Sequence, residues 1–322
     1  MYLPLLFSLK LRANCSSVPR VESHGLFYSQ GINHSVDTRV PDKDMEALVA
    51  GFTIPPQPKL MLDIEKVYPD IDKIALVVQR DQGVAAAVLR TVNSPFFGLK
   101  THVHNIPQAV ALLGLTKLMA VINATLVRSM VQEPDIYRQL DIFWSATDET
   151  TFAATQICRR TKIGDVDQAY LTGLFHNCAV PLLLCRHANY FEIMGEACKQ
   201  EDMPVGDYED NLLGTSHAAL GYFVAKAWKL PLPVCDVIRD HHDLGQIRSY
   251  LAQPELPTTQ LMAVLLAAQT ITGETAAIAK GQADAEWFFV ADDVRYLLGL
   301  SESDFQDMGE DIGEQILKNR SQ

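Results

Sequence analysis

Histidines at the ends of predicted helices are the residues of this sequence best suited to chemistry. In the stretch GLFHNCAVPLLL, an apolar helical run is followed by His176 and Asn177. His217 stands where another helix is expected to begin, and His241 and His242 close a third. Because His241 shares the apolar stripe of its helix, we expect it to point inward. Inward-pointing imidazoles from separate helices are the groups that build an all-helical metal site.

Such a site also needs carboxylate ligands, and the sequence does not place them on the inner face beside these histidines. A hydrolytic centre with two metal ions needs an aspartate that bridges or anchors the ions and holds a nucleophilic water. The neighbour of His176 is an amide, Asn177. Asp240 and Asp243 flank the histidine pair, but both fall off the apolar stripe. The sequence therefore predicts the frame of a metal-hydrolase site without its acidic ligands.

Simpler interpretations of the same residues stay open. His217 can satisfy backbone groups at its helix start, and His241 and His242 can be one packed and one solvent-facing imidazole. Cys178, two residues after His176, could form a Cys–His nucleophile, but a thiol in so apolar a run should have a raised pKa and be inert. The sequence contains neither the G-x-x-x-x-G-K-[ST] phosphate loop nor the G-x-G-x-x-G dinucleotide fingerprint.

The composition is that of a globular protein. The chain has 322 residues, 48% hydrophobic and 20% charged, with a net charge of −12 that argues against broad binding of nucleic acid or anionic membranes. Six cysteines without a C-x-x-C pair favour reduced thiols in the cytoplasm.

The N-terminal MYLPLLFSLKLRANC has no basic segment ahead of its apolar run, and the apolar stretch 109–127 is interrupted by Gly114, Lys117 and Asn123. We expect neither a signal peptide nor a membrane span.

Helical periodicity dominates from Asp42 onward and predicts an all-α fold in two consecutive helical lobes. Asn105 and the Ser301–Asp304 pair have the positions of helix caps, and Gly114 that of a helix stop. The predicted parts are an N-terminal extension of irregular or β structure (1–41), a first lobe (42–132), a second lobe (133–275) and a C-terminal helical tail (276–322).

Several motifs are similar, in the same order, to those of a known family. In the first lobe they are IPPQPKL (54–60), RDQGVAAAVLRTVNSPFFG (80–98) and NIPQAVALLGLTKL (105–118). In the second lobe they are FWSAT (143–147), AYLTGLFHNCAVPLLL (169–184), GTSHAALGYFVAKAWKLP (214–231) and IRDHH (238–242). From about Met45 to Ile271 the chain resembles the HD-related output domain (HDOD), a bacterial signalling module derived from the HD metal-dependent phosphohydrolase superfamily.

The resemblance also identifies what is missing. In catalytic HD proteins a histidine on the first helix, a His-Asp pair, further histidines and a late aspartate hold the metal ions. Here the first-helix slot is Ala146, the pair is His176–Asn177, and the late slot is Gln269. The histidines that remain besides His176 are His217, His241 and His242. We therefore predict a vestigial site of neutral ligands only, which should bind metal poorly and lack a well-placed base.

The function that the resemblance implies is non-catalytic regulation. The module would present a helical surface or groove to a signalling protein, or bind a small nucleotide-like ligand in the vestigial pocket, in a two-component or cyclic-nucleotide setting. No cofactor is expected. The alternative is a metal-dependent phosphohydrolase for a nucleotide or phosphodiester. Its metal ligands would be His176, His217 and His241, with a carboxylate from Asp240 or Asp243.

Overall fold

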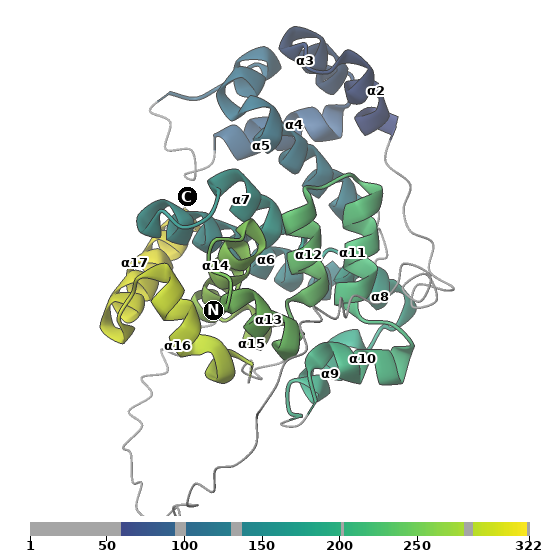
Figure 1. Cartoon of the computed structure of the whole chain (residues 1–322). Helices are drawn as coiled ribbons and strands as arrows, with labels where there is room; N and C mark the ends of the chain where they lie inside the picture. Colours follow the sequence, from purple (N-terminus) through teal and green to yellow (C-terminus); the bar gives the residue numbers. More distant parts are fainter. Residues whose placement is uncertain (1–58, 94–100, 130–136, 201–202, 280–285, 321–322) are drawn as a thin grey trace, which may run out of the picture. The chain divides into compact units, whose positions relative to one another are not determined.

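The computed structural model describes residues 59–93, 101–129, 137–200, 203–279 and 286–320. Every regular element in these ranges is a helix, which confirms the predicted all-α fold (Figure 1). The predicted N-terminal extension, residues 1–41, lies outside the described residues. Among the described helices, no single one has both the length and the apolar character of a membrane span.

The first lobe consists of four helices around one apolar core. Asp70 and Asp81 cap the second and third helices by accepting hydrogen bonds from the backbone N–H groups of Lys73 and Val84. The last helix is broken at Gly114, whose φ of 69° is outside the helical region. The four helices are α2 (Lys59–Val67), α3 (Ile71–Gln79), α4 (Gln82–Val92) and α5 (Ile106–Ser129).

The second lobe has α14 (Pro257–Thr272) at its centre. Its sequence is apolar on nearly all sides, the pattern of a helix buried all round, and its residues from Leu261 to Gln269 are all buried. The C-terminal helices α16 and α17 belong to the same apolar core, since Val294 and Ile312 pack in it. The helices around α14 include α6 (Tyr137–Thr161), α7 (Val166–Phe175), α12 (Leu232–Asp240), α13 (Leu244–Leu251), α16 (Trp287–Leu298) and α17 (Glu302–Arg320).

One predicted helix of the second lobe is divided into two helices in the structure. The sequence predicts a single helix from Pro181 to Gln200, whereas the structure has α8 (Val180–Arg186) and α9 (Tyr190–Ala197). His187 ends α8 in an extended conformation. The chain then turns so that Tyr190 is wholly buried, which a continuous helix would not require. The remaining helices of this lobe are α10 (Val205–Leu213), α11 (His217–Ala227) and α15 (Glu274–Ile278).

Candidate functional site

The four histidines singled out in the sequence come together inside the second lobe. The ring centroid of His241 lies 5.6 Å from that of His176, 5.2 Å from that of His217 and 4.3 Å from that of His242. The first three imidazoles are 0% exposed and His242 is 8% exposed. The histidines therefore form one buried cluster, which we call the histidine cluster.

Helix ends place these side chains. His176 and His241 are the C-terminal cap residues of α7 and α12, and His217 is the first residue of α11. Ser216 starts α11 by accepting a hydrogen bond from the N–H of Ala219. The helices approach closely at glycines, because a Cβ on Gly221 would lie 3.1 Å from the Ile238 side chain.

Three buried glutamates accompany the cluster, each within hydrogen-bonding distance of one histidine. Glu209 Oε2 lies 2.7 Å from His217 Nδ1, and Glu286 Oε2 lies 2.7 Å from His242 Nδ1. Glu274 Oε2 lies 2.9 Å from His176 Nε2. The glutamates are 0%, 6% and 1% exposed, in that order. Buried carboxylates therefore lie beside the histidines, at positions that the sequence did not single out.

Sequence reasoning missed these glutamates because no local pattern places all three on an inner helix face. Glu209 belongs to VGDYEDNLL, where acidic residues occur at three of nine positions. One signal was available: Glu209 follows the buried Val205 by four residues, which places both on the inner face of α10. Glu274 and Glu286 begin short or new helices, and their neighbours indicate no inner face.

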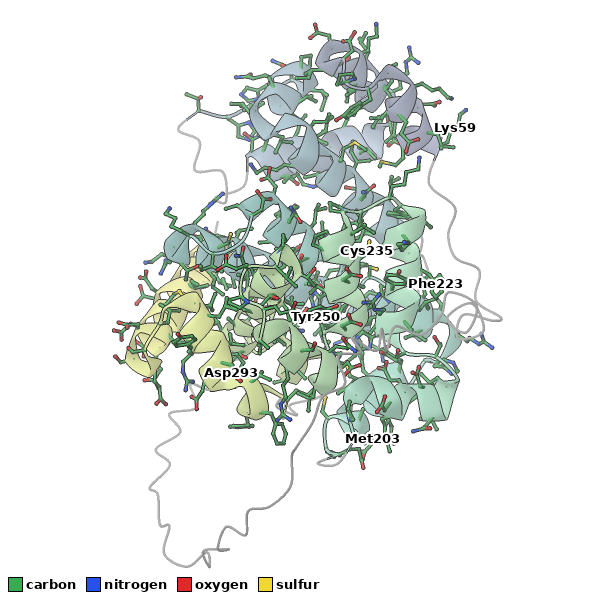
Figure 2. The ribbon with its side chains drawn as sticks, viewed as in Figure 1. Lys59, Met203, Phe223, Cys235, Tyr250 and Asp293 are labelled. Atoms are coloured by element: carbon green, nitrogen blue, oxygen red, sulfur yellow. The ribbon has the colours of Figure 1, made fainter. Side chains whose placement is uncertain are left out.

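The two aspartates proposed from the sequence do not serve the histidine cluster. Asp240 is buried, but it accepts hydrogen bonds from the Arg239 guanidinium and from the hydroxyl of Tyr250, which Figure 2 labels. Asp243 caps α13 by accepting a hydrogen bond from the N–H of Gln246. Both are structural residues of α12 and α13 in this arrangement.

The residues in the remaining family slots are buried as well. Ala146 lies on α6 and Gln269 on α14, each 5% exposed. Within the described part of the chain, no hydrogen bond joins Gln269 to the four histidines. Asn177 is 3% exposed, and its Nδ2 lies 2.8 Å from His176 Nε2. Asn177 is thus the only one of these three slots joined by a hydrogen bond to a cluster imidazole in the described residues.

The two ring nitrogens of His176 have three polar neighbours. Its Nδ1 lies 2.9 Å from the Gly173 carbonyl oxygen and must donate to it, which leaves a lone pair on Nε2 in the neutral ring. That lone pair can accept a hydrogen bond from Asn177 but would repel the Glu274 carboxylate. Among the described residues, Glu274 Oε1 and Asn177 Oδ1 are buried without a hydrogen-bond partner. The Nε2 atom can therefore serve only one of its two neighbours at a time: without a proton it accepts from Asn177, and with a proton it donates to Glu274.

The Nε2 atoms of His217 and His241 lie close together within the histidine cluster. His217 Nδ1 donates to Glu209 and His241 Nδ1 donates to the Ile238 carbonyl, while their Nε2 atoms lie 3.2 Å apart. Burial, followed by the nearby charges of His242, His217 and His176, holds the pKa of His241 well below its ordinary value. Burial would raise the pKa of Glu209, but the charge and hydrogen bonds of His217 and the hydrogen bond from Tyr190 lower it overall. These directions favour an ionised Glu209 and a neutral His241.

The cluster can be tested against the metal ions that the HD superfamily uses. One ring nitrogen of each of His217, His241 and His242 lies within 4.8 Å of the others. Nitrogens bound to one tetrahedral zinc ion are about 3.3 Å apart, given zinc–nitrogen bonds of about 2.0–2.1 Å. A buried acceptor behind each ring is also the usual outer environment of metal-binding histidines. These residues fit one metal ion, but an aspartate-bridged pair of ions does not fit because Asn177 replaces the bridge.

The nearby thiol is unsuited to catalysis. Cys178 is 3% exposed, and burial raises the pKa of its thiol to about 12. A thiol that is neutral at physiological pH is a poor nucleophile and a poor metal ligand. The prediction that Cys178 is inert agrees with this environment.

Comparison with known proteins places the chain among HD-related modules. The HDOD domain model matches residues 54–244. A protein of Treponema pallidum (strain Nichols), uncharacterized, is 27% identical over 199 residues; the match covers 59% of this chain but only 38% of that protein. The chain thus spans well under half the length of this relative.

Solved structures share the fold. An HDOD domain protein of unknown function from Geobacter sulfurreducens is 23% identical, with a TM-score of 0.57 over 84% of this chain and 92% of that one. A proposed signal transduction protein from Marinobacter aquaeolei is 19% identical, with a TM-score of 0.60 over 87% and 64% of the two chains. A proposed phosphohydrolase from Shewanella amazonensis is 21% identical, with a TM-score of 0.57 over 81% and 90%. At these identities the likeness shows the fold alone, whereas the domain match extends over more than half of the sequence. The chain belongs to the HDOD family.

Proposed function

We propose that this protein is a non-catalytic regulatory module that transmits a signal by binding another protein. The observation that carries the proposal is the closure of the histidine cluster. His176, His217 and His241 have no exposed surface and His242 is only 8% exposed, so a phosphodiester cannot contact the first three in this conformation. A hydrolase needs its reacting atoms within contact of the substrate.

The side-chain identities support the same conclusion. Asn177 supplies an amide where a two-metal centre needs a bridging carboxylate, and Ala146 and Gln269 carry no charge. The three buried glutamates each lie within hydrogen-bonding distance of a histidine, so in this conformation they face imidazoles and not a substrate. Two of these contacts join helices: Glu274 and His176 join α15 to α7, and Glu209 and His217 join α10 to α11.

The partner in this proposal is a signalling protein that binds the helical surface. The similarity of the fold to a proposed signal transduction protein is consistent with that role. A two-component or cyclic-nucleotide pathway in bacteria is the setting in which we place it, and the partner is to be identified by its binding to the full chain.

Hydrolysis assays on the full chain test the proposal. The protein is incubated with manganese, iron or zinc and with bis(p-nitrophenyl) phosphate, nucleoside triphosphates and cyclic dinucleotides. We expect turnover no higher than that of His176→Ala, with His102→Ala as the matched control because His102 is exposed and lies outside the cluster. Turnover in the unmodified protein and in His102→Ala that disappears in His176→Ala would overturn the proposal.

A metal-dependent phosphohydrolase is the second candidate, and the convergence of three imidazole nitrogens favours it. In that function His217, His241 and His242 would hold the ion, which would supply Lewis-acid chemistry. Glu209 and Glu286 would orient the rings, and Glu274 would hold a proton at His176. Elemental analysis separates the candidates further, since stoichiometric metal without turnover leaves the regulatory function standing.

A further inference from the structure

A cavity apart from the histidine cluster lies among helices of both lobes. It has a volume of about 780 Å³ and is lined by residues of α4, α5, α6, α7 and α17. None of the four cluster histidines lines it. Cavities of roughly 300–1,000 Å³ are those that enclose small organic ligands. The vestigial site is closed, so this cavity is the better place for a small ligand.

Part of the cavity wall is apolar. Ala87 and Val121 from the first lobe and Leu174 from α7 are buried residues that line it. Phe152 on α6 and Ile316 on α17 complete this part of the wall. Such a wall is suited to the flat or aliphatic body of a ligand, because burying apolar area favours binding.

The charged part of the lining carries an excess of one cation. Three arginines line the cavity with two acids. Arg128 pairs with Asp148, and Arg320 pairs with Glu149. Arg90 is exposed and has no ion-pair partner in the described residues. The balance leaves one positive charge in a protein whose net charge is −12, so the feature is local and not a general property of the surface.

Arg128 adds an unsatisfied donor. Its Nε is buried and has no hydrogen-bond partner in the described part of the chain. The guanidinium is held in place, since it lies 5.0 Å from the ring centroid of Trp144 and bonds to Asp148. The Arg128 side chain as a whole is 38% exposed, so the end of its guanidinium remains open to an oxygen atom of a bound anion beside its bond to Asp148.

We propose that this cavity binds a small organic anion. Its oxyanion head, a phosphate or a carboxylate, would bond to Arg90 and Arg128, and its apolar body would pack on Phe152 and Leu174. A ligand there contacts α4 and α5 of the first lobe and α6, α7 and α17 of the second, so its binding free energy stabilises that joint arrangement. This is an input site for a small molecule, separate from the protein-binding function proposed above.

Thermal-shift and calorimetric titrations of the full chain test the proposal. The probes are AMP, phenyl phosphate and indole-3-acetate, each compared with its uncharged counterpart: adenosine, phenol and indole-3-acetamide. We expect an acidic probe to raise the melting temperature where its neutral counterpart does not. Affinity should fall by roughly tenfold or more in Arg90→Gln. Arg248→Gln, an exposed arginine on α13 outside the cavity, should bind as the unmodified protein does.

Two further variants test whether a loss of binding has a cause other than the lost charge of Arg90. Arg128→Gln should also weaken binding, but it breaks the pair with Asp148 and can destabilise the fold. Ser145→Trp places a large ring at an exposed position of the lining and should block binding while leaving every charge unchanged. Three outcomes would each overturn the proposal. The neutral compounds bind as tightly as the acids, or both Arg90→Gln and Ser145→Trp keep full affinity, or no acid binds at millimolar concentration. The phosphate and carboxylate probes distinguish the two head groups.

Discussion

Glu274 Oε2 lies 2.9 Å from His176 Nε2, although 98 residues separate the two in the sequence and neither side chain has exposed surface. The contact places a carboxylate beside His176, whose sequence neighbour Asn177 is neutral. Glu274 belongs to α15 and lies five residues after the position where catalytic HD proteins carry their late aspartate. The pair joins α7 to α15 by an ionic contact in the interior.

The first prediction concerns this pair. Replacing Glu274 with Gln keeps the shape but removes the charge that faces His176, so the free energy of unfolding should fall by about 1–3 kcal/mol. Urea denaturation of the variant and of the unmodified protein measures the loss. Glu310→Gln, on an exposed position of α17, is the control and should change stability by less than about 0.5 kcal/mol. Equal stability of the two variants would contradict an ionic role for the pair.

The second prediction is a pH dependence at Asp210. Burial raises the pKa of its carboxyl to about 6, and the charges of Glu209 and Asp207 act in the same direction, against a hydrogen bond from Ser216. Because the folded pKa is above the unfolded value of 3.8, ionisation is less favourable in the folded protein. The resulting penalty is absent below pH 3.8, grows as pH rises to about 6, and is complete above it.

Asp210→Asn should therefore stabilise the protein at pH 7.5, and the gain should disappear below about pH 4. We expect a gain of about 1 kcal/mol, less than the roughly 3 kcal/mol that the full shift represents, because the carboxyl is partly solvated. Denaturation curves between pH 4 and 8 measure it. Glu310→Gln, an exposed acid on α17 that does not act on Asp210, controls for the change in net charge. A gain independent of pH would show that the cause is not the ionisation of Asp210.

The third prediction tests the close approach of α6 and α7, which sets the position of His176. A Cβ on Gly173 would lie 2.7 Å from Thr151 Cα, so the two helices cannot keep their spacing in Gly173→Ala. We expect a loss of about 1–3 kcal/mol in urea denaturation. Gly313→Ala is the matched control: its Cβ meets nothing within 4 Å, and alanine in α17 should be neutral or stabilising by up to about 1 kcal/mol. Similar effects of the two substitutions would argue against close helix packing at Gly173.

The fourth prediction is the order in which the thiols react. Cys185 is exposed, whereas Cys158, Cys178 and Cys235 are buried with pKa values of about 11, about 12 and about 11, raised chiefly by burial. At pH 7.5 iodoacetamide should label Cys185 in the folded protein and the three buried thiols only after denaturation. Peptide mass spectrometry assigns each label. Rapid labelling of Cys178 in the folded state would show that the core near His176 opens.

Local signals predicted much of the helical framework. Asn105 accepts a hydrogen bond from the N–H of Gln108, and Ser301 and Asp304 exchange the two hydrogen bonds of a capping box, as their spacing indicates. The break at Gly114 likewise occurs where it was predicted. These features succeed because caps and stops depend on residues within one turn of each other. The prediction of one helix over Pro181–Gln200 was wrong. The break between α8 and α9 depends on burying Tyr190 against a different part of the chain, which local signals do not report.

The helical class, the histidines at helix ends and the amide at position 177 follow from the amino-acid sequence, since each depends on residue type or short-range spacing. That Glu209, Glu274 and Glu286 lie beside those histidines follows from the packing of helices distant in sequence. A glutamate is otherwise expected in water, where its charge is well solvated. Helices distant in sequence bring these three into the interior, and there an imidazole partner offsets the loss of hydration that would otherwise keep each carboxylate at the surface.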